Sequence, residues 1–262
     1  MSLGLNREPA FSFSVHLPLA TMVEATRSIH QNFLDEDIDP ISAQTVHESN
    51  LTQVHLQPFI DDSPHPIGIA PAYAESDSRL VALAIANQTN VLLVEFYSSK
   101  PNRDGRGKGA GSSIKTRDYT GRFLLQKEIF CRPYGDIFAF DFEPIALSLY
   151  NDHAGLRIVN GIDIQSACLP KNRQPLASIK LAVGDSATIY EDNVRDSFEN
   201  MIFDQKRTTA IALRAWIAQY LPRLDTMEET FAKAKRIDTT KLHDIVSLSA
   251  DFDQYQADHG CS

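Results

Sequence analysis

Three short apolar runs, separated by polar turns, form the clearest pattern in the chain. They are Ile67–Tyr73, Arg79–Ala86 and Val91–Phe96. Apolar runs of this length, bounded by turn-forming residues, are typical of buried strands. The pattern therefore predicts three successive strands between residues 65 and 98.

The pattern after residue 120 alternates between strands and helices. It predicts a helix beginning at Phe123–Leu125, a strand at Ile137–Phe140, a helix over Pro144–Asn151 that ends at Gly155, a short strand at Leu156–Val159, a turn at Gly161–Ile164 into the next helix, and helices at Pro175–Ala182 and Ala210–Leu221. Proline is tolerated in the first turn of a helix, and glycine is common just after its last turn. Strands that alternate with helices indicate an α/β fold.

The two ends of the chain are predicted to lie outside this sheet. Residues 1–60 form an N-terminal segment with a helix after Thr21, whose spacing to Glu24 suits a capping box, and a short strand at Val54–Leu56. Residues 61–224 form the main domain, with an insertion at 99–117. Residues 225–262 form C-terminal helices, one beginning near Thr226 and one over Lys241–Tyr255.

Composition limits the class of protein. The chain has 262 residues, 43% of them hydrophobic, which is enough for one large domain and an appendage. Its net charge of −9 argues against a surface coated with basic residues for nucleic acid. The odd number of widely spaced cysteines, Cys131, Cys168 and Cys261, favours reduced thiols in an intracellular setting, nuclear or cytoplasmic. No run suits a membrane helix or a signal peptide, so we expect no membrane partner.

Common catalytic motifs are missing from the sequence. The eight histidines do not cluster, and no Cys-x-x-Cys, Gly-x-Ser-x-Gly or phosphate-binding Gly-x-x-x-x-Gly-Lys occurs. We therefore expect neither a bound metal nor a cofactor.

The insertion at 99–117 is rich in glycine and in positive charge. Its basic residues stand against Asp104 alone; they are Lys100, Arg103, Arg106, Lys108, Lys115 and Arg117. Two interpretations stay open: a solvated surface loop, or a loop that contacts RNA phosphates.

Six pieces in order resemble the DEDD 3′–5′ exonucleases of the ribonuclease D and Werner group. The resemblance covers roughly residues 65–224. The pieces are the three-strand block, the strand, turn and helix that begin at Ile137, the segment Asn160-Gly-Ile-Asp163 that follows them, the helix Pro175–Ala182, the segment Asp196–Asp204, and the helix Ala210–Leu221. The resemblance implies an RNase H-like mixed sheet of five or six strands flanked by helices, with N- and C-terminal helical extensions.

The family's metal-binding positions are changed in this chain. The first strand of the family ends in Asp-x-Glu, and Ala70 and Ala72 stand at those positions. The last aspartate corresponds to Arg214, and no carboxylate stands between Pro144 and Ala146, where the second motif places one. Alanine offers no oxygen to a hard cation. The resemblance therefore implies a natural pseudo-exonuclease without catalytic or metal-binding residues.

Arg214 has two open interpretations. Its guanidinium could bind a phosphate or a carboxylate bidentately, or it could pair with Asp141, Glu143 or Asp163 and fill the former metal site.

Three functional hypotheses follow. The first is a protein–protein adapter in RNA processing or silencing, with protein partners that include a second copy of the chain. The second is an RNA-binding pseudo-nuclease that holds single-stranded RNA with the basic loop. The third is a residual metal-dependent exonuclease that uses Asp141, Glu143 and Asp163.

Overall fold

The computed structural model describes residues 26–96, 120–153, 155–169, 171–184 and 187–240. The predicted basic loop at 99–117 and the predicted helix over Lys241–Tyr255 lie outside these ranges. The predicted helix after Thr21 begins outside them and extends to Phe33, and it is wrong in its described part, because Arg27–Ile29 form a strand.

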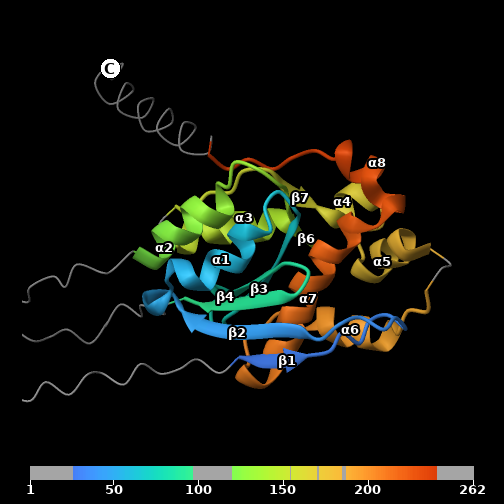
Figure 1. Cartoon of the computed structure of the whole chain (residues 1–262), viewed down its shortest axis with the longest axis horizontal. Coiled ribbons are helices and arrows are strands. Elements are labelled where there is room, and N and C mark those ends of the chain that lie inside the picture. The colour runs from blue at the N-terminus through green and yellow to red at the C-terminus, as the bar shows by residue number, and fades with distance from the viewer. Residues whose placement is uncertain (1–25, 97–119, 154, 170, 185–186, 241–262) are drawn as a thin grey trace, which may run out of the picture.

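A mixed sheet of seven strands crosses the molecule in the order β1-β2-β5-β4-β3-β6-β7 (Figure 1). The strands are β1 (Arg27–Ile29), β2 (Ile41–His47), β3 (Ile67–Tyr73), β4 (Leu80–Ala86), β5 (Asn90–Glu95), β6 (Ile137–Ala139) and β7 (Gly161–Asp163). Strands β3, β4 and β5 pair antiparallel in succession, and β1 pairs antiparallel with β2. Parallel pairs join β2 to β5, β3 to β6, and β6 to β7.

Helices cover both faces of this sheet (Figure 1). One face carries α1 (Gln53–Asp61), α2 (Thr120–Leu124), the π-helical turn Leu125–Phe130 that continues it, and α3 (Phe142–Asp152). The other carries α4 (Ile164–Cys168), α5 (Pro175–Val183), α6 (Glu191–Glu199), α7 (Thr208–Tyr220) and α8 (Glu228–Ala232).

The central strands are buried on both sides, and their residues alternate between two cores. On β3, Ile67 and Ile69 join the core under α1 and α3, whereas Ala70 and Ala72 join the core under α7. Strand side chains point to opposite faces in turn, so a strand with helices on both faces is apolar at every position. This explains why β3, β4 and β5 appear in the sequence as continuous apolar runs.

The predicted α/β class, with a mixed sheet flanked by helices, is confirmed. The three-strand block, the strand near Ile137 and the helices near Pro144, Pro175 and Ala210 are where the sequence predicted them. The sheet has seven strands rather than five or six.

The prediction for the N-terminal segment was wrong in part. Residues 27–47 supply β1 and β2 to the sheet, and Val54–Leu56 lie in helix α1 rather than in a strand. Strand β2 pairs with β5, far along the chain, with Ser42 opposite Asn90. Because that pairing is non-local, the local apolar pattern does not reveal it. Helix α1 begins with a reciprocal capping box between Thr52 and His55 that the sequence analysis missed.

Three further local predictions were wrong. The segment Gly161–Ile164, predicted as a turn, supplies strand β7 at Gly161–Asp163, which pairs with β6. Leu156–Val159 is not a strand; its backbone bonds to other segments, with Val159 N donating to Phe130 O at 2.9 Å. Thr226 does not cap a helix, because its hydroxyl donates to Ala182 O at 2.9 Å. Met227 and Phe231, which follow Thr226, are nevertheless buried.

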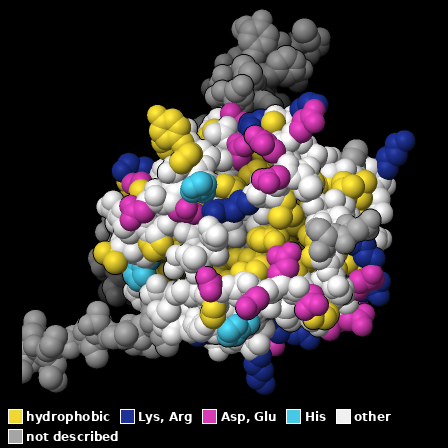
Figure 2. Space-filling view, turned by 45° about the vertical axis from the view of Figure 1, so that its right-hand side comes forward, with side chains coloured by type: hydrophobic (Ala, Val, Ile, Leu, Met, Phe, Trp, Pro, Cys, Tyr) yellow, Lys and Arg dark blue, Asp and Glu magenta, His cyan; other side chains and the backbone are white. Residues whose placement is uncertain are grey.

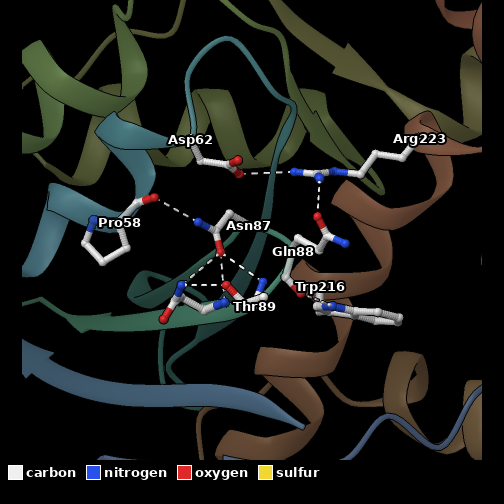
Figure 3. A network of polar contacts seen from close by, with 8 residues as sticks. Pro58, Asp62, Asn87, Gln88, Thr89, Trp216 and Arg223 are labelled. Atoms are coloured by element: carbon white, nitrogen blue, oxygen red, sulfur yellow. Dashed lines mark hydrogen bonds and ion pairs between the residues drawn. The ribbon is translucent and has the colours of Figure 1, made fainter. Parts of the chain in front are cut away.

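The turn between β4 and β5 is held by a polar network that joins three elements (Figure 3). Asn87 donates from Nδ2 to Pro58 O in α1 at 2.9 Å and accepts from Asn90 N at 2.8 Å. The carbonyl of Gln88 accepts from Trp216 Nε1 in α7 at 3.1 Å. The hairpin turn therefore ties together helices from opposite faces of the sheet.

Cys131 and Cys168 are free thiols, and burial raises the pKa of Cys168 to about 12. Cys261 lies outside the described ranges. None of the described helices has the length and apolar character needed to cross a bilayer.

Candidate functional site

The face of β3 that meets α7 is made of small residues. Gly68, Ala70 and Ala72 follow each other on this face, and Ala82, Ala84 and Ala86 extend the surface on β4. A Cβ atom on Gly68 would lie 2.0 Å from Ala215 O and 2.6 Å from Gln219 N. Helix α7 therefore lies directly on the backbone of β3, which larger side chains would prevent.

Helix α7 buries Arg214 beside the end of β3. The side chain is 2% exposed, and Nη2 donates to Pro71 O at 2.9 Å, while Nη1 makes a long 3.5 Å bond to Asn200 O. Burial lowers the pKa of Arg214 to about 10. Of the two interpretations of Arg214, the ion pair with Asp141, Glu143 or Asp163 is wrong: within the described residues, this guanidinium donates to backbone carbonyls.

Local backbone structure explains why Pro71 O is available. Strand β6 pairs with β3 only at Ile67 and Gly68, so Pro71 lies beyond that pairing and proline removes no bond to β6. The connection from α6 to α7 continues along the end of β3 instead: Tyr73 N donates to Met201 O and Phe203 N donates to Tyr73 O, both at 2.8 Å.

A small hollow of about 10 Å³ lies where these elements meet, and we call it the β3 hollow. It is lined by Ile69, Ala70, Pro71, Phe140, Phe198, Met201 and Arg214. The structure thus brings two of the predicted degenerate positions, Ala70 and Arg214, to one place, and Ala72 is fully buried in the same core.

The three carboxylates of the residual-nuclease hypothesis meet around a different arginine. Arg173 Nη2 contacts Asp163 Oδ2 at 2.5 Å and Asp141 Oδ1 at 3.7 Å, and Nη1 lies 3.8 Å from Glu143 Oε2. Asp163 is 4% exposed and also accepts from Ser166 Oγ at 2.6 Å. We call Arg173, Asp141, Glu143 and Asp163 together the carboxylate–arginine cluster. The sequence analysis missed Arg173, which stands in an unpatterned polar stretch between two helices.

Backbone geometry places Asp141 in this cluster. Asp141 is in the left-handed region at φ 52°, and its N–H donates to Oε1 of the buried Gln165 at 2.8 Å. Aspartate tolerates this conformation better than most residues. Burial raises the pKa of Asp141, and the negative charge of Asp163 raises it further, while Arg173 opposes both.

Two clefts flank the carboxylate–arginine cluster. One, of about 670 Å³, lies between α4 and the segment after α8 and is lined by Glu143, Asp163, Ser166, Lys235 and Arg236, among others. The other, of about 390 Å³, we call the outer cleft; it lies between α5 and α6 and includes Asp141, Arg173, Arg195, Phe198 and Met201. Figure 2 shows one face of the molecule, on which hydrophobic side chains are exposed in a hollow that charged side chains surround.

Within the described ranges, no three His, Cys, Asp or Glu side chains are arranged to hold a metal ion together. The candidate RNA-binding residues, Lys100 to Arg117, lie outside those ranges.

Two exonuclease domains are among the solved structures similar to this chain. The Nibbler EXO domain of Aedes aegypti has a TM-score of 0.45 at 11% identity, over 70% of this chain and 91% of its own. The exonuclease domain of EXD2, from a crystal soaked in Mg and GMP, has a TM-score of 0.31 at 17% identity, over 73% and 93%. No model of a protein family matches the sequence, and no curated protein matches it.

Proposed function

We propose that this chain is a catalytically inactive, exonuclease-like scaffold that acts as a protein–protein adapter in an RNA-processing or RNA-silencing pathway. The burial of Arg214 against β3 carries the proposal. In the family that the sequence resembles, this position and those of Ala70 and Ala72 bind metal ions through carboxylates.

Physical chemistry disfavours metal binding at these positions. Methyl groups at Ala70 and Ala72 supply no oxygen ligand, and a cation that is 2% exposed repels a second cation at short range. Two-metal hydrolysis needs carboxylates that hold both ions beside the scissile phosphate. The carboxylate–arginine cluster does have three carboxylates, but Arg173 already neutralises part of their charge.

An RNA cleavage assay tests the inactive state. Purified full-length protein is incubated with labelled single-stranded RNA in Mn²⁺, and we expect no products that exceed those of a buffer control. Cleavage by the wild type that the Asp163→Asn variant lacks would overturn the proposal and revive the residual-nuclease hypothesis. The triple variant Ala70→Asp/Ala72→Glu/Arg214→Asp provides a comparison: Mn²⁺ binding gained by this variant in calorimetry would support a degenerate metal site.

Exposed apolar side chains on α1 and α2 support the adapter role. Val54 is 80% exposed and Phe123 is 64% exposed, on helices that cover the same face of the sheet. We expect the Val54→Ser/Phe123→Ser variant to lose protein partners in affinity purification while its Tm stays unchanged. The control is Ile202→Ser, which changes an exposed apolar side chain on another part of the surface. Equal recovery of partners by all three proteins would argue against this surface.

RNA binding without cleavage is a second candidate function, favoured by the local excess of positive charge at 99–117 in a chain of net charge −9. Replacement of Lys100, Arg103, Arg106 and Lys108 by alanine should then abolish an RNA mobility shift and flatten its dependence on salt. A control with the same charge change replaces four exposed lysines elsewhere, namely Lys171, Lys206, Lys233 and Lys235. If the loop variant and the control bind RNA equally, the loop is not the binding site.

A further inference from the structure

An exposed phenylalanine and an exposed lysine lie together on the outer side of α2. Phe123 is 64% exposed. Lys127 follows four residues later, in the π-helical turn that continues α2, and its side chain is 63% exposed. Side chains four residues apart lie on the same face of a helix. Phe123 and Lys127 therefore form one exposed stripe, an apolar ring beside a cation, which we call the α2 stripe.

The chain returns to α2 just before residue 241. Thr239 N donates to Ile158 O at 2.9 Å, and Ile158 N donates to Thr239 Oγ1 at 2.8 Å. The preceding residue, Arg157, donates from its backbone N to Gln126 Oε1 at 2.7 Å. Gln126 stands between Phe123 and Lys127 in the sequence. The residues that follow Thr240 therefore start beside the α2 stripe.

The sequence from 241 to 255 has the pattern of an amphipathic helix. Its apolar residues recur at spacings of three and four, which places them on one helical face; they are Leu242, Ile245, Val246, Leu248 and Phe252. At 1.5 Å per residue this face would be about 15 Å long, which matches α2 with its π-helical turn, Thr120–Phe130. An amphipathic helix buries its apolar face against another surface.

Charge favours the same pairing. The segment 241–255 has three aspartates, Asp244, Asp251 and Asp253, against Lys241. On the side of α2, Lys127 contacts Glu128 at 2.7 Å but stays largely exposed. Arg157, beside the point where the segment begins, has a buried Nε without a hydrogen-bond partner within the described residues. An acidic segment is therefore attracted to this surface.

We infer that residues 241–255 cover the α2 stripe of their own chain, with the apolar face of the segment on Phe123. The same chain is favoured over a second copy because the short connection from Thr240 gives the segment a high effective concentration beside α2. The inference rests on the proposed function in one respect: Phe123 also belongs to the surface proposed for protein partners. A partner and the segment would then compete for Phe123, which makes the segment a regulator of the adapter surface.

A photo-cross-link from position 123 tests this inference in the full chain. The change Phe123→p-benzoylphenylalanine keeps an aromatic side chain on the stripe. Trypsin then releases residues 123–127 and residues 242–262 as single peptides, because Lys or Arg stands before each and neither occurs within 242–262. After irradiation we expect these two peptides to be joined in protein of monomer mass. No product, a product with another peptide, or a product only at dimer mass would overturn the inference.

A matched position and matched variants control this test. The same photo-reactive residue in place of Tyr190, an exposed aromatic residue at the start of α6 on the other face of the sheet, should give no product with residues 242–262. Ile245→Asp/Val246→Asp should reduce the cross-link from position 123 at least tenfold. His243→Asp/Ser247→Asp adds the same charge outside the apolar face and should keep it. Equal yields from the two variants would show that the apolar face does not make the contact.

The cross-link is measured without any partner, so its result is separate from that of the adapter proposal. If the cross-link forms but affinity purification recovers no partners, the adapter role fails and this inference stands. If partners are recovered through Phe123 but no cross-link forms, the adapter role stands and this inference is wrong.

Discussion

At the scale of single residues, polar side chains in this protein are buried where they satisfy backbone groups of distant segments. Asp152 and His153, at the end of α3, both bond to Leu80 at the start of β4. Asp152 Oδ2 accepts from Leu80 N at 3.1 Å, and His153 Nε2 lies 2.8 Å from Leu80 O. The two adjacent side chains therefore fix one residue of the central sheet.

His153 should make the protein sensitive to mild acid. Burial lowers the pKa of His153 below its usual value of 6.5, and the ring is stacked on Phe96 with centroids 4.0 Å apart. The folded state therefore binds fewer protons than the unfolded state. Stability is complete above about pH 6.5 and falls as the pH drops below it, by at most about 1.4 kcal/mol per pH unit from this group.

The test compares urea unfolding at pH 7.5 and pH 5.5. We expect His153→Gln to be less stable than the wild type at pH 7.5 but to lose less stability on acidification. His65→Gln, at an exposed position, serves as the control. If the wild type and His153→Gln lose the same amount, His153 is not the titrating group.

Asn87 should be the residue of the β4–β5 turn that contributes most to stability. It is 3% exposed, and its side chain bonds to Pro58 O, Thr89 N and Asn90 N. Asn87→Ala leaves Pro58 O and the turn amides without this partner, which should cost about 2–3 kcal/mol in urea unfolding. Thr89→Ala, in the same turn but exposed, should cost less than about 0.5 kcal/mol. If the two variants lose the same free energy of unfolding, the hydrogen bonds of the Asn87 side chain are not the main source of the stability of the turn.

At the scale of elements, the contact between α7 and β3 decides the candidate site. The small residues Gly68, Ala70 and Ala72 let α7 lie on the backbone of the strand. That close approach brings Arg214 within 2.9 Å of Pro71 O. Ala70 and Ala72 therefore have a packing role in this chain, in addition to what the resemblance implies about lost metal ligands.

Gly68→Ala tests this close approach. The new methyl group would meet Ala215 O at 2.0 Å, so α7 must move away from β3. We expect a loss of about 3 kcal/mol in the free energy of unfolding, at the upper end for overpacked cores. Gly155→Ala is the comparison, because its Cβ would meet its nearest neighbour at 4.0 Å and the cost there comes from its φ of +74° alone, about 1–2 kcal/mol. If Gly68→Ala loses less free energy of unfolding than Gly155→Ala, helix α7 can move away from β3 at little cost and the close approach is not required.

At the scale of the whole molecule, a segment near residue 240 completes the sheet. Ile237 and Gly161 exchange backbone hydrogen bonds of 2.7 and 3.0 Å beside β7. Thr239 Oγ1 then accepts from Ile158 N at 2.8 Å, across 81 residues of chain. This contact covers the edge of β7, which would otherwise present open backbone groups.

Thr239→Val tests how strongly this segment is held. The buried N–H of Ile158 would lose its acceptor, which should cost about 1–2 kcal/mol. Hydrogen exchange at Ile158 and Gly161 should accelerate more than exchange in β4. Thr240→Val is the control, since its hydroxyl bonds only locally to Asp238 at 2.6 Å. Uniform acceleration across the sheet would indicate global rather than local loosening.

The sequence by itself was enough to predict the helices and strands that are buried on both sides. Strands β3, β4 and β5 and helix α7 are apolar enough that their local pattern predicts them, and the α/β class follows from their order. Strand β2 was missed because its partner β5 lies far along the chain, where periodicity carries no information. Strand β1 has only three residues and pairs with β2, so its local pattern is too short to predict it, and Val54–Leu56 in helix α1 were misread as a strand.

Tertiary structure decided the chemistry of the candidate site. The sequence identifies Ala70, Ala72 and Arg214 as candidate site residues only through a resemblance, and it does not give the partners of Arg214. Chain folding brings Arg173, not Arg214, to Asp141, Glu143 and Asp163, and it leaves Arg214 with backbone carbonyls. Ion pairing depends on distances of a few ångströms between segments far apart in sequence, and only the packed fold sets those distances.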